Sequence, residues 1–225
     1  MYKGEYTPPT LTVDSVVFQL VDGQLQVLLI RRSQEPFKDS WALPGGYCAA
    51  GETTHDAMER ILADKAGVRP SDLRLVEQLY TFDTVARDPR GHAVSVTYMG
   101  LGLDITPRHD GHVQQPRFYP VNDLPDLAYD HAAIIDYALE RLQSKLMYTN
   151  AIYALLPKLF SLTQLQTAYE AVLGRELDKR NFRKKFLSLN LIEATAGQLK
   201  EGAHRPARLY RFRQDDLQTL TRSFD

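Results

Sequence analysis

The residues best placed to do chemistry lie in one segment, GYCAAGETTHDAMERILADKAGV, at positions 46–68. It opens at a pair of glycines, and an acid, Glu52, and a base, Arg60, follow. A glycine-bearing loop lets backbone amides approach a phosphorylated ligand closely. A helix after such a loop can direct carboxylates toward a divalent metal, which binds oxygen anions. The segment therefore predicts a site for a phosphorylated compound.

Six positions of this segment resemble the Nudix box, whose pattern is G-x5-E-x7-R-E-U-x-E-E-x-G-U, with U an aliphatic residue. The preceding WALPGG at 41–46 also looks like the lead-in of many Nudix proteins, and the resemblance covers about residues 10–140. It implies an α+β fold built on a Nudix-type α/β/α sandwich with a mixed sheet. The positions in register are Gly46, Glu52, Arg60, Leu62, Gly67 and Val68.

The metal-binding glutamates of that pattern are missing from this chain. In the family three glutamates hold magnesium or manganese, but here the three positions carry Ile61, Asp64 and Lys65. Isoleucine offers no lone pair, and an ammonium about 4 Å from a divalent cation is repelled by several kcal/mol even at an effective dielectric of about 20. We therefore predict no catalytic residue, no metal site and no required cofactor, and hence no enzyme. An unusual metal geometry that uses Glu52 and Asp64 is the open alternative.

Basic and glycine residues around the box are the predicted contacts to the ligand. Glu52 and Arg60 also have a simpler role, as an ion pair that fixes the loop on the helix. Lys65 has two open roles, a counter-charge for a diphosphate in place of the metal or a lysine that faces solvent. His131 could cap a helix, touch the ligand or transmit its presence to the second half of the chain. The predicted ligand-binding residues are Arg32, Gly45, Gly46, Glu52, Arg60, Lys65, Arg87, Arg90 and His131.

Strands and one helix must position these side chains in the first half of the chain. Two apolar runs around the turn residues Asp22 and Gly23 predict a hairpin. Apolar residues at helical spacing after the glycine loop predict a helix, which Gly67 ends. Two later strands, rich in β-branched and aromatic residues, flank a polar loop that we expect to face solvent. The elements are expected over Leu11–Phe18, Leu25–Ile30, Thr54–Ala66, Leu75–Phe82 and Ala93–Leu103, with the loop at Asp83–His92.

The pattern changes to that of helices from Asp130 onward. Apolar residues recur there at steps of three and four, which predicts an amphipathic helix that bridges two domains. A capping box of Ser161 and Gln164 then opens a second helix, which ends before Gly174. The bridging helix is predicted from Ala133, Ile134, Tyr137, Ala138, Leu142 and Leu146.

A third helix and a hairpin complete the chain. Asp178 can cap this helix, which extends through about Leu189. Two strand-like segments follow, Leu191–Thr195 and Arg208–Arg213, around the turn-rich stretch Ala196–Pro206. Three helices followed by a hairpin are the order of a winged helix-turn-helix domain. We therefore predict two domains, residues 1–147 and residues 148–225.

The third predicted helix separates apolar and basic side chains by angle. At about 100° per residue, Phe182, Phe186 and Leu189 share one side, and basic residues occupy the other. A duplex major groove accepts such a helix, since Arg and Asn can bind base edges and Lys can pair with phosphates. A basic surface helix with no partner is the alternative, but the arginines of the hairpin favour DNA. The predicted DNA-binding residues are Lys179, Arg180, Asn181, Arg183, Lys184, Arg205, Arg208 and Arg211.

Composition and charge agree with this division. The net charge of −1 combines 14 Lys and Arg against 20 Asp and Glu before Tyr148 with 13 against 8 from there onward. A basic second half suggests contact with a polyanion. The single cysteine, Cys48, excludes an internal disulfide. Without an apolar run of about 20 residues or a signal core, we expect a cytoplasmic protein with no membrane contact.

The second half also resembles a known family. The run YTNAIYALLPKLFSLTQLQTAYEAVLGRELDKRNFRKKFL, after DHAAIIDYALERLQSKL, is similar to the C-terminal part of the Nudix-related transcriptional regulators, bacterial repressors of NAD metabolism. This resemblance implies a homodimer that binds a double-stranded DNA operator with two-fold symmetry. It also implies that the Nudix domain binds ADP-ribose or a related nucleotide sugar as its effector, which releases the DNA.

Two other functions stay open at this point. One is a metal-dependent Nudix hydrolase of ADP-ribose-like compounds that carries an accessory nucleic-acid-binding domain. The other is a scaffold for other proteins, which would bind neither DNA nor nucleotides. The substitutions at Ile61, Asp64 and Lys65 favour the regulator over the hydrolase.

Overall fold

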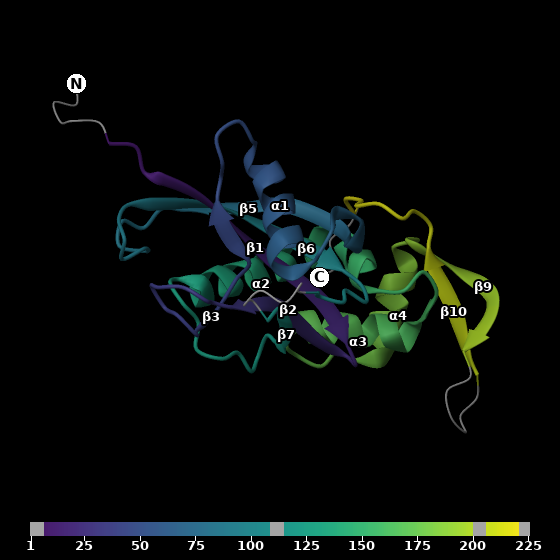
Figure 1. Cartoon of the computed structure of the whole chain (residues 1–225). Helices are drawn as coiled ribbons and strands as arrows, with labels where there is room; N and C mark the ends of the chain where they lie inside the picture. The colour runs from purple at the N-terminus through teal and green to yellow at the C-terminus, as the bar shows by residue number, and fades with distance from the viewer. Residues whose placement is uncertain (1–6, 109–114, 200–205, 221–225) are drawn as a thin grey trace.

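The first half of the chain forms a mixed sheet between two helices. The computed structural model describes residues 7–108, 115–199 and 206–220 (Figure 1). The sheet order is β3-β2-β1-β6-β5, with β4 and β7 attached to β1 and β2; β1 and β6 run parallel, and the other pairs are antiparallel. Its strands are β1 (Thr10–Val21), β2 (Gln24–Arg31), β3 (Trp41–Ala42), β4 (Gly45–Tyr47), β5 (Leu73–Phe82), β6 (Ala93–Gly102) and β7 (Arg117–Pro120).

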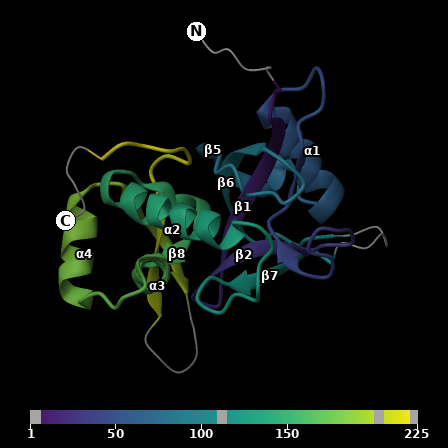
Figure 2. The same cartoon turned by 90° about the vertical axis from the view of Figure 1, so that its left-hand side faces the viewer.

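Alternating side chains of β1 fill two apolar layers. Val13 and Val17 point to one face and pack with helix α1 (Thr54–Ala66), whereas Val16 and Phe18 point to the other face and pack with helix α2 (His131–Tyr148). The two helices lie on opposite faces of the sheet in Figure 2. The predicted α/β/α sandwich with a mixed sheet is thus confirmed.

Helix α1 has the predicted bounds, because local signals fix both ends. Thr53 caps its first turn in a capping box with Asp56, and Gly67 adopts a left-handed φ of 63° at the C-terminal end. A 3₁₀ turn, η1 (Pro70–Asp72), then leads into β5. The helix places Ile61 in the core and turns Lys65 toward β4.

The second half is a winged helix-turn-helix, as predicted. Its sheet is antiparallel with the order β8-β10-β9. Phe182 and Phe186 pack on the fully buried ring of Tyr169, at centroid distances of 5.4 and 5.6 Å. The elements are η2 (Ala151–Leu155), β8 (Phe160–Ser161), α3 (Leu162–Leu173), α4 (Lys179–Ser188), β9 (Ile192–Leu199) and β10 (Ala207–Phe212).

One apolar core extends from the sheet through α2 into the winged helix. It includes Val16 and Met99 of the sheet, Leu142 of α2, and Phe212 of the last strand. The predicted boundary after residue 147 falls at the end of α2, which continues to Tyr148. The division into two domains there stays a prediction. Because α2 is shared, a movement of this helix reaches both halves.

Several details differ from the sequence-based predictions. Ala133, assigned to the apolar side of α2, is exposed. The loop 83–92 does not lie wholly in solvent, because Arg87 folds inward and is 9% exposed. Part of the predicted turn Ala196–Pro206 is strand, since β9 extends to Leu199. The turn η2 carried no sequence signal that we recognised. In the described parts of the chain, no helix is long and apolar enough to span a bilayer.

Candidate ligand pocket and DNA-binding helix

A cavity of about 550 Å³ opens beside β4 and the start of α2. Its walls come from β1, β4, α1, the loop after β2, the loop between β5 and β6, and the residues around the N-terminus of α2. Of the nine predicted ligand-binding residues, Glu52 alone does not line it. Those that do are Arg32, Gly45, Gly46, Arg60, Lys65, Arg87, Arg90 and His131.

The pocket carries a surplus of positive charge. Five Arg and Lys residues line it, against three Asp and Glu residues. Most of these cations have a carboxylate partner, but two do not among the described residues. Arg32 donates to the carbonyl oxygens of Pro36 and Gln34, and Lys65 donates to that of Gly45. Arg32 and Lys65 are therefore the cations best able to pair with an incoming anion.

Lys65 points into this pocket, so the alternative of a solvent-facing lysine is wrong. Burial, together with the nearby charges of Arg32 and Arg60, lowers the pKa of its ammonium, and the Asp14 carboxylate opposes this shift. A buried ammonium with only carbonyl contacts gains strongly from an anionic ligand. Its ammonium is thus placed to meet an anion that enters the pocket.

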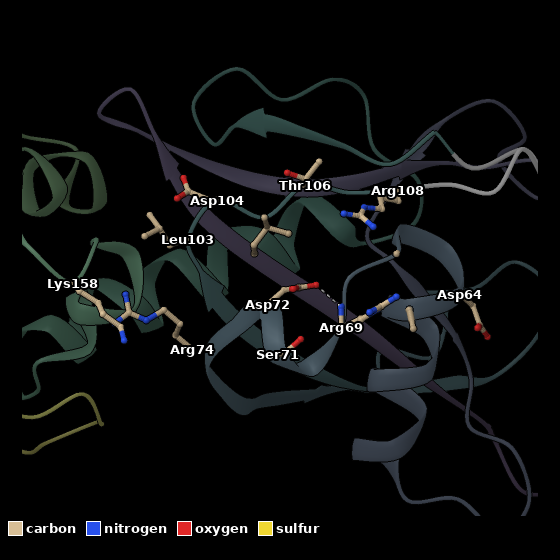
Figure 3. Close-up of a pocket in the computed structure, with 13 residues that line it drawn as sticks. Asp64, Arg69, Ser71, Asp72, Arg74, Leu103, Asp104, Thr106, Arg108 and Lys158 are labelled. Carbon is tan, nitrogen blue, oxygen red and sulfur yellow. Dashed lines mark hydrogen bonds between the residues drawn. The ribbon is translucent and has the colours of Figure 1, made fainter.

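Asp64 faces away from the pocket and lies on the wall of a second cavity of about 950 Å³ (Figure 3). Neither Asp64 nor Glu52 lines the first pocket, and the alternative metal geometry that uses both stays a hypothesis. The second cavity holds none of the predicted ligand residues, and its four Arg and Lys residues face three aspartates. One of these bases, Arg74, donates to the carbonyl oxygen of Leu156. We therefore place the ligand site in the smaller, more basic pocket.

Glu52 and Arg60 form the expected ion pair behind the pocket. The guanidinium donates to both carboxylate oxygens, with 3.0 Å from Nε to Oε2, and also to the carbonyl oxygen of Tyr47 at 3.1 Å. The hydrogen bond from Arg60, followed by the one from the Ala49 amide, lowers the pKa of Glu52 to about 2. The pair joins the glycine loop to α1, and both carboxylate oxygens of Glu52 are hydrogen-bonded to Arg60.

A buried polar network closes the far wall of the pocket. Arg87 donates to both oxygens of Asp130, at 2.9 and 2.8 Å, and to Asp14 at 3.3 Å. The Ser95 hydroxyl donates to the same Asp14 oxygen at 2.6 Å. Burial alone would lower the pKa of Arg87, but its hydrogen bonds to Asp130 and the charge of Asp14 raise it. This network ties β1, β6 and the β5–β6 loop to the start of α2.

His131 does not cap α2, contrary to one of its predicted roles. Its Nδ1 accepts the backbone N–H of Leu43 at 2.8 Å, and its Nε2 lies 3.7 Å from an Asp14 oxygen. An Nδ1 acceptor requires the neutral tautomer with hydrogen on Nε2. The helix has no side-chain cap, because the carboxylate of its N-cap residue, Asp130, is bound to Arg87. His131 thus links α2 to the pocket wall.

The burial of His131 predicts a loss of stability in mild acid. Burial lowers its pKa below the ordinary value of 6.5, although Asp14 and Asp130 oppose the shift. Below that pH the imidazole of His131 binds a proton in the unfolded chain more readily than in the folded chain. The contribution of His131 to the free energy of unfolding is therefore complete above pH 6.5. It is lost as the pH falls below that value, by at most about 1.4 kcal/mol per pH unit. Urea unfolding at pH 7.5 and 5.5 should show it, and His131→Asn should reduce the difference; an unchanged difference would contradict this assignment.

The exposed face of α4 is basic, as the sequence predicted. Lys179, Arg180, Asn181 and Lys184 are exposed, opposite buried Phe182 and Phe186. Arg183 is half-buried and donates to the Thr163 hydroxyl of α3 at 3.1 Å. It therefore lies at the edge of this face and not at its centre.

The hairpin supplies fewer available charges than its sequence suggests. Arg208 is exposed, but Arg211 and Arg213 both pair with Glu193, at 2.6 and 3.3 Å. Arg205 falls outside the described residues. We therefore expect α4 to contribute more than the hairpin strands to DNA affinity.

Substitutions on α4 should weaken DNA binding without unfolding the protein. Arg180→Ala and Lys184→Ala each remove an exposed charge, and each should lower DNA affinity about 5- to 50-fold and reduce its salt dependence. Arg211→Ala should have a smaller effect, since this charge is already paired with Glu193. Fluorescence anisotropy at several salt concentrations measures the effect. Wild-type DNA affinity in both α4 variants would show that this helix does not contact the DNA.

Two domain families match successive parts of the chain. Residues 10–142 match the NUDIX domain, and residues 152–212 match the NrtR DNA-binding winged helix domain. Over its length the chain is 37% identical to the ADPR responsive transcriptional repressor NtrR of Acinetobacter baylyi, covering 95% of this chain and 86% of that protein. The chain belongs to the NrtR family.

Two further proteins are similar to this NrtR-family chain. NrtR of Shewanella oneidensis in complex with a 27mer DNA is 33% identical, with a TM-score of 0.80 over 96% of this chain and 99% of that one. Its NUDIX domain in complex with ADP ribose is 36% identical, with a TM-score of 0.56 over 61% of this chain and 90% of that one. An ADP-ribose pyrophosphatase of Methanocaldococcus jannaschii is 33% identical over 135 residues, 59% of this chain and 75% of that protein. Repressors and hydrolases thus both occur among its relatives.

Among the pocket residues that sequence reasoning missed in this NrtR-family chain are Asp14, Tyr47 and Tyr129. Asp14 carried a usable signal, because a carboxylate within an otherwise apolar strand must find a partner. Tyr129 directly precedes the pair Asp130–His131, but nothing in the sequence indicates its conformation. In the described parts of the chain, no three His, Cys, Asp or Glu residues gather to hold a metal ion.

Proposed function

We propose that this NrtR-family chain is a DNA-binding transcriptional repressor that responds to ADP-ribose. The observation that carries the proposal is the Lys65 ammonium, which occupies a metal-ligand position of the Nudix box and points into a basic pocket. The same core joins that pocket to a winged helix with an exposed basic face. The named relatives support this pairing of an ADP-ribose site with DNA binding.

The pocket suits a diphosphate in a specific way. Gly45 and Gly46 bring the β4 backbone close to the pocket residues, since a Cβ at Gly45 would collide with the Asp14 carboxylate and one at Gly46 would lie 3.7 Å from the Lys65 ammonium. Lys65 and Arg32 offer charge-assisted hydrogen bonds, which are shorter and stronger than neutral ones. Arg90 and Tyr47 lie together at the rim, with 3.1 Å between the guanidinium and the phenol oxygen. The predicted ligand-binding residues that line this pocket, with Arg32 and Lys65 foremost, are proposed to hold ADP-ribose here.

We further propose that the pocket binds this ligand without cleaving it and without a required cofactor. Metal-assisted hydrolysis needs carboxylates to hold the cation and to activate water. Here Ile61 is buried, Asp64 faces another cavity, and Glu52 is held by Arg60. A lysine at the third position repels a divalent cation. A metal-dependent hydrolase stays the second candidate, supported by the pyrophosphatase relative.

The DNA partner is proposed to be a two-fold symmetric operator near genes of NAD metabolism. One chain presents one α4, and a homodimer would present two for matching half-sites. ADP-ribose is proposed to bind the DNA-free form more tightly, since an effector with equal affinity for both forms would shift no equilibrium. Ligand binding would then release the DNA.

A DNA titration tests this function. Labelled duplexes from upstream of neighbouring NAD-metabolism genes are titrated with the full chain at fixed salt, with and without ADP-ribose, and light scattering gives the oligomeric state. We expect a dimer that binds one of the duplexes and loses at least tenfold in affinity with saturating ADP-ribose, but not with AMP. If ADP-ribose leaves the DNA affinity unchanged, the proposed regulation is wrong. If neither DNA nor nucleotide binds, the scaffold alternative gains support.

A further inference from the structure

Tyr129 joins the ligand pocket to the helix shared by both halves of the molecule. It lines the pocket and immediately precedes Asp130, the N-cap residue of α2. The other end of α2 lies in the core of the winged helix, where Gln143 donates to the carbonyl oxygen of Val172 in α3 at 2.9 Å. A change in conformation at Tyr129 would therefore act on the first turn of a helix that reaches the DNA-binding half.

Tyr129 is held in an unfavourable state. Its φ is 56°, in the left-handed region that bulky side chains rarely adopt. Its hydroxyl oxygen is buried and has no hydrogen-bond partner among the described residues, which is uncommon for a buried polar group. Both features occur at one residue beside a pocket. Such features persist only where surrounding contacts impose them, and they concentrate at functional sites.

Three side chains impose this state on the Tyr129 ring. The Arg32 guanidinium lies 4.8 Å from its centroid, and the ring centroids of Phe37, in an edge-to-face arrangement, and of His131 lie 4.8 and 5.3 Å from it. Phe37 also has a left-handed φ, of 63°. Two strained aromatic residues thus hold each other in place, with Arg32 packed on one of them.

Arg32 is the one of these contacts that an anion can remove. Among the described residues its guanidinium donates only to carbonyl oxygens and makes no ion pair. A phosphate within its reach offers a stronger, charge-assisted partner than an aromatic ring does. The ligand and Tyr129 therefore compete for the same guanidinium.

We propose that Tyr129 is a positioning residue that couples the pocket to α2: without ligand Arg32 packs on its strained ring, and when an anion draws Arg32 away, Tyr129 relaxes and shifts the first turn of α2. That turn has no side-chain cap, and its N-cap residue, Asp130, is held by Arg87, so a shift at Tyr129 would act directly on the contact between Arg87 and Asp130. This coupling rests on the proposed function and names its regulatory step. The competition for Arg32 supplies the difference in affinity that any ligand-driven switch requires.

Hydrogen exchange over residues 131–138 of the full chain, with and without ADP-ribose, tests the coupling alongside DNA affinity. Tyr129→Gly relieves the left-handed strain and removes the ring, whereas Tyr129→Phe keeps the ring. We expect Tyr129→Gly to bind ADP-ribose within about tenfold of wild type but to lose the ligand-dependent change in exchange. Its ratio of DNA affinities without and with ligand should fall to below about 2, while Tyr129→Phe keeps both responses. Asp104→Gly relieves a left-handed residue outside this pocket and should behave as wild type.

The outcomes separate this coupling from the proposed function. If ADP-ribose fails to weaken DNA binding by wild type, the proposed function fails. The exchange data then still decide the coupling, with inorganic diphosphate as a second probe, because the coupling needs only an anion at Arg32. If α2 responds to neither probe in wild type, or responds equally in wild type and Tyr129→Gly, the coupling is wrong.

Discussion

Arg87→Ala is expected to lower the free energy of unfolding by about 3–5 kcal/mol, because it removes one partner from a buried ion network. Arg87 is the sole base that bridges Asp14 and Asp130 among the described residues. Asp14 is 5% exposed, so its carboxylate would stay buried with the Ser95 hydroxyl as its hydrogen-bond donor and the neutral His131 ring at 3.7 Å, and with Lys65 as the nearby charge in the pocket. Urea denaturation at neutral pH measures the loss.

Arg90→Ala on the same loop is the control for this variant. Arg90 also pairs with an aspartate, Asp88, at 2.7 Å, but its side chain is 46% exposed. Water screens the exposed Arg90 guanidinium even though the Asp88 side chain is 9% exposed, so Arg90→Ala should cost less stability than Arg87→Ala. If the two variants lose the same stability, the network around Asp14 does not fix the start of α2 as described.

Lys65→Ala should weaken ADP-ribose binding about 10- to 100-fold. The reason is that a charge-assisted hydrogen bond contributes about 1.5–3 kcal/mol, and each 1.4 kcal/mol changes the dissociation constant tenfold. No other lysine lines this pocket in the described chain. Isothermal titration calorimetry with the full chain gives the affinity directly.

Lys158→Ala is the matched control for the pocket lysine. Lys158 is exposed and lies on the second cavity, so its removal should leave ADP-ribose affinity within about twofold of wild type. Lys65→Arg should retain part of the affinity, since it keeps the charge but changes the donor geometry. Wild-type affinity in Lys65→Ala would end the proposed role of this ammonium.

Elements with strong local signals could be predicted from the sequence. The capping residue Thr53 and the left-handed Gly67 fix α1, so its predicted bounds match. Ser161 and Gln164 begin α3 for the same reason. The Nudix spacing placed Gly46, Arg60 and Lys65 at the pocket, because that motif encodes a loop and a helix in one short segment. Short-range sequence signals thus predicted two helices and part of the pocket.

Features set by tertiary contacts could not be predicted. The loop 83–92 reads as exposed because it is polar, yet Arg87 turns inward to two carboxylates that lie far away in the chain. His131 lies where a capping residue is expected, but its Nδ1 accepts a hydrogen bond from the backbone N–H of Leu43. The strain at Tyr129 follows from packing against Arg32 and Phe37, which no local pattern encodes. In each case, contacts with residues distant in the sequence determine the conformation of the side chain or backbone.

Incubation of the pure full chain with ADP-ribose and magnesium or manganese tests the central claim most directly, with products separated by ion-exchange chromatography. A pocket in which Lys65 has replaced a metal-binding carboxylate should return the bound ADP-ribose intact, at turnover far below about 1 per second. Turnover in the ordinary enzyme range of about 1–1000 per second would contradict that claim and identify the chain as a hydrolase.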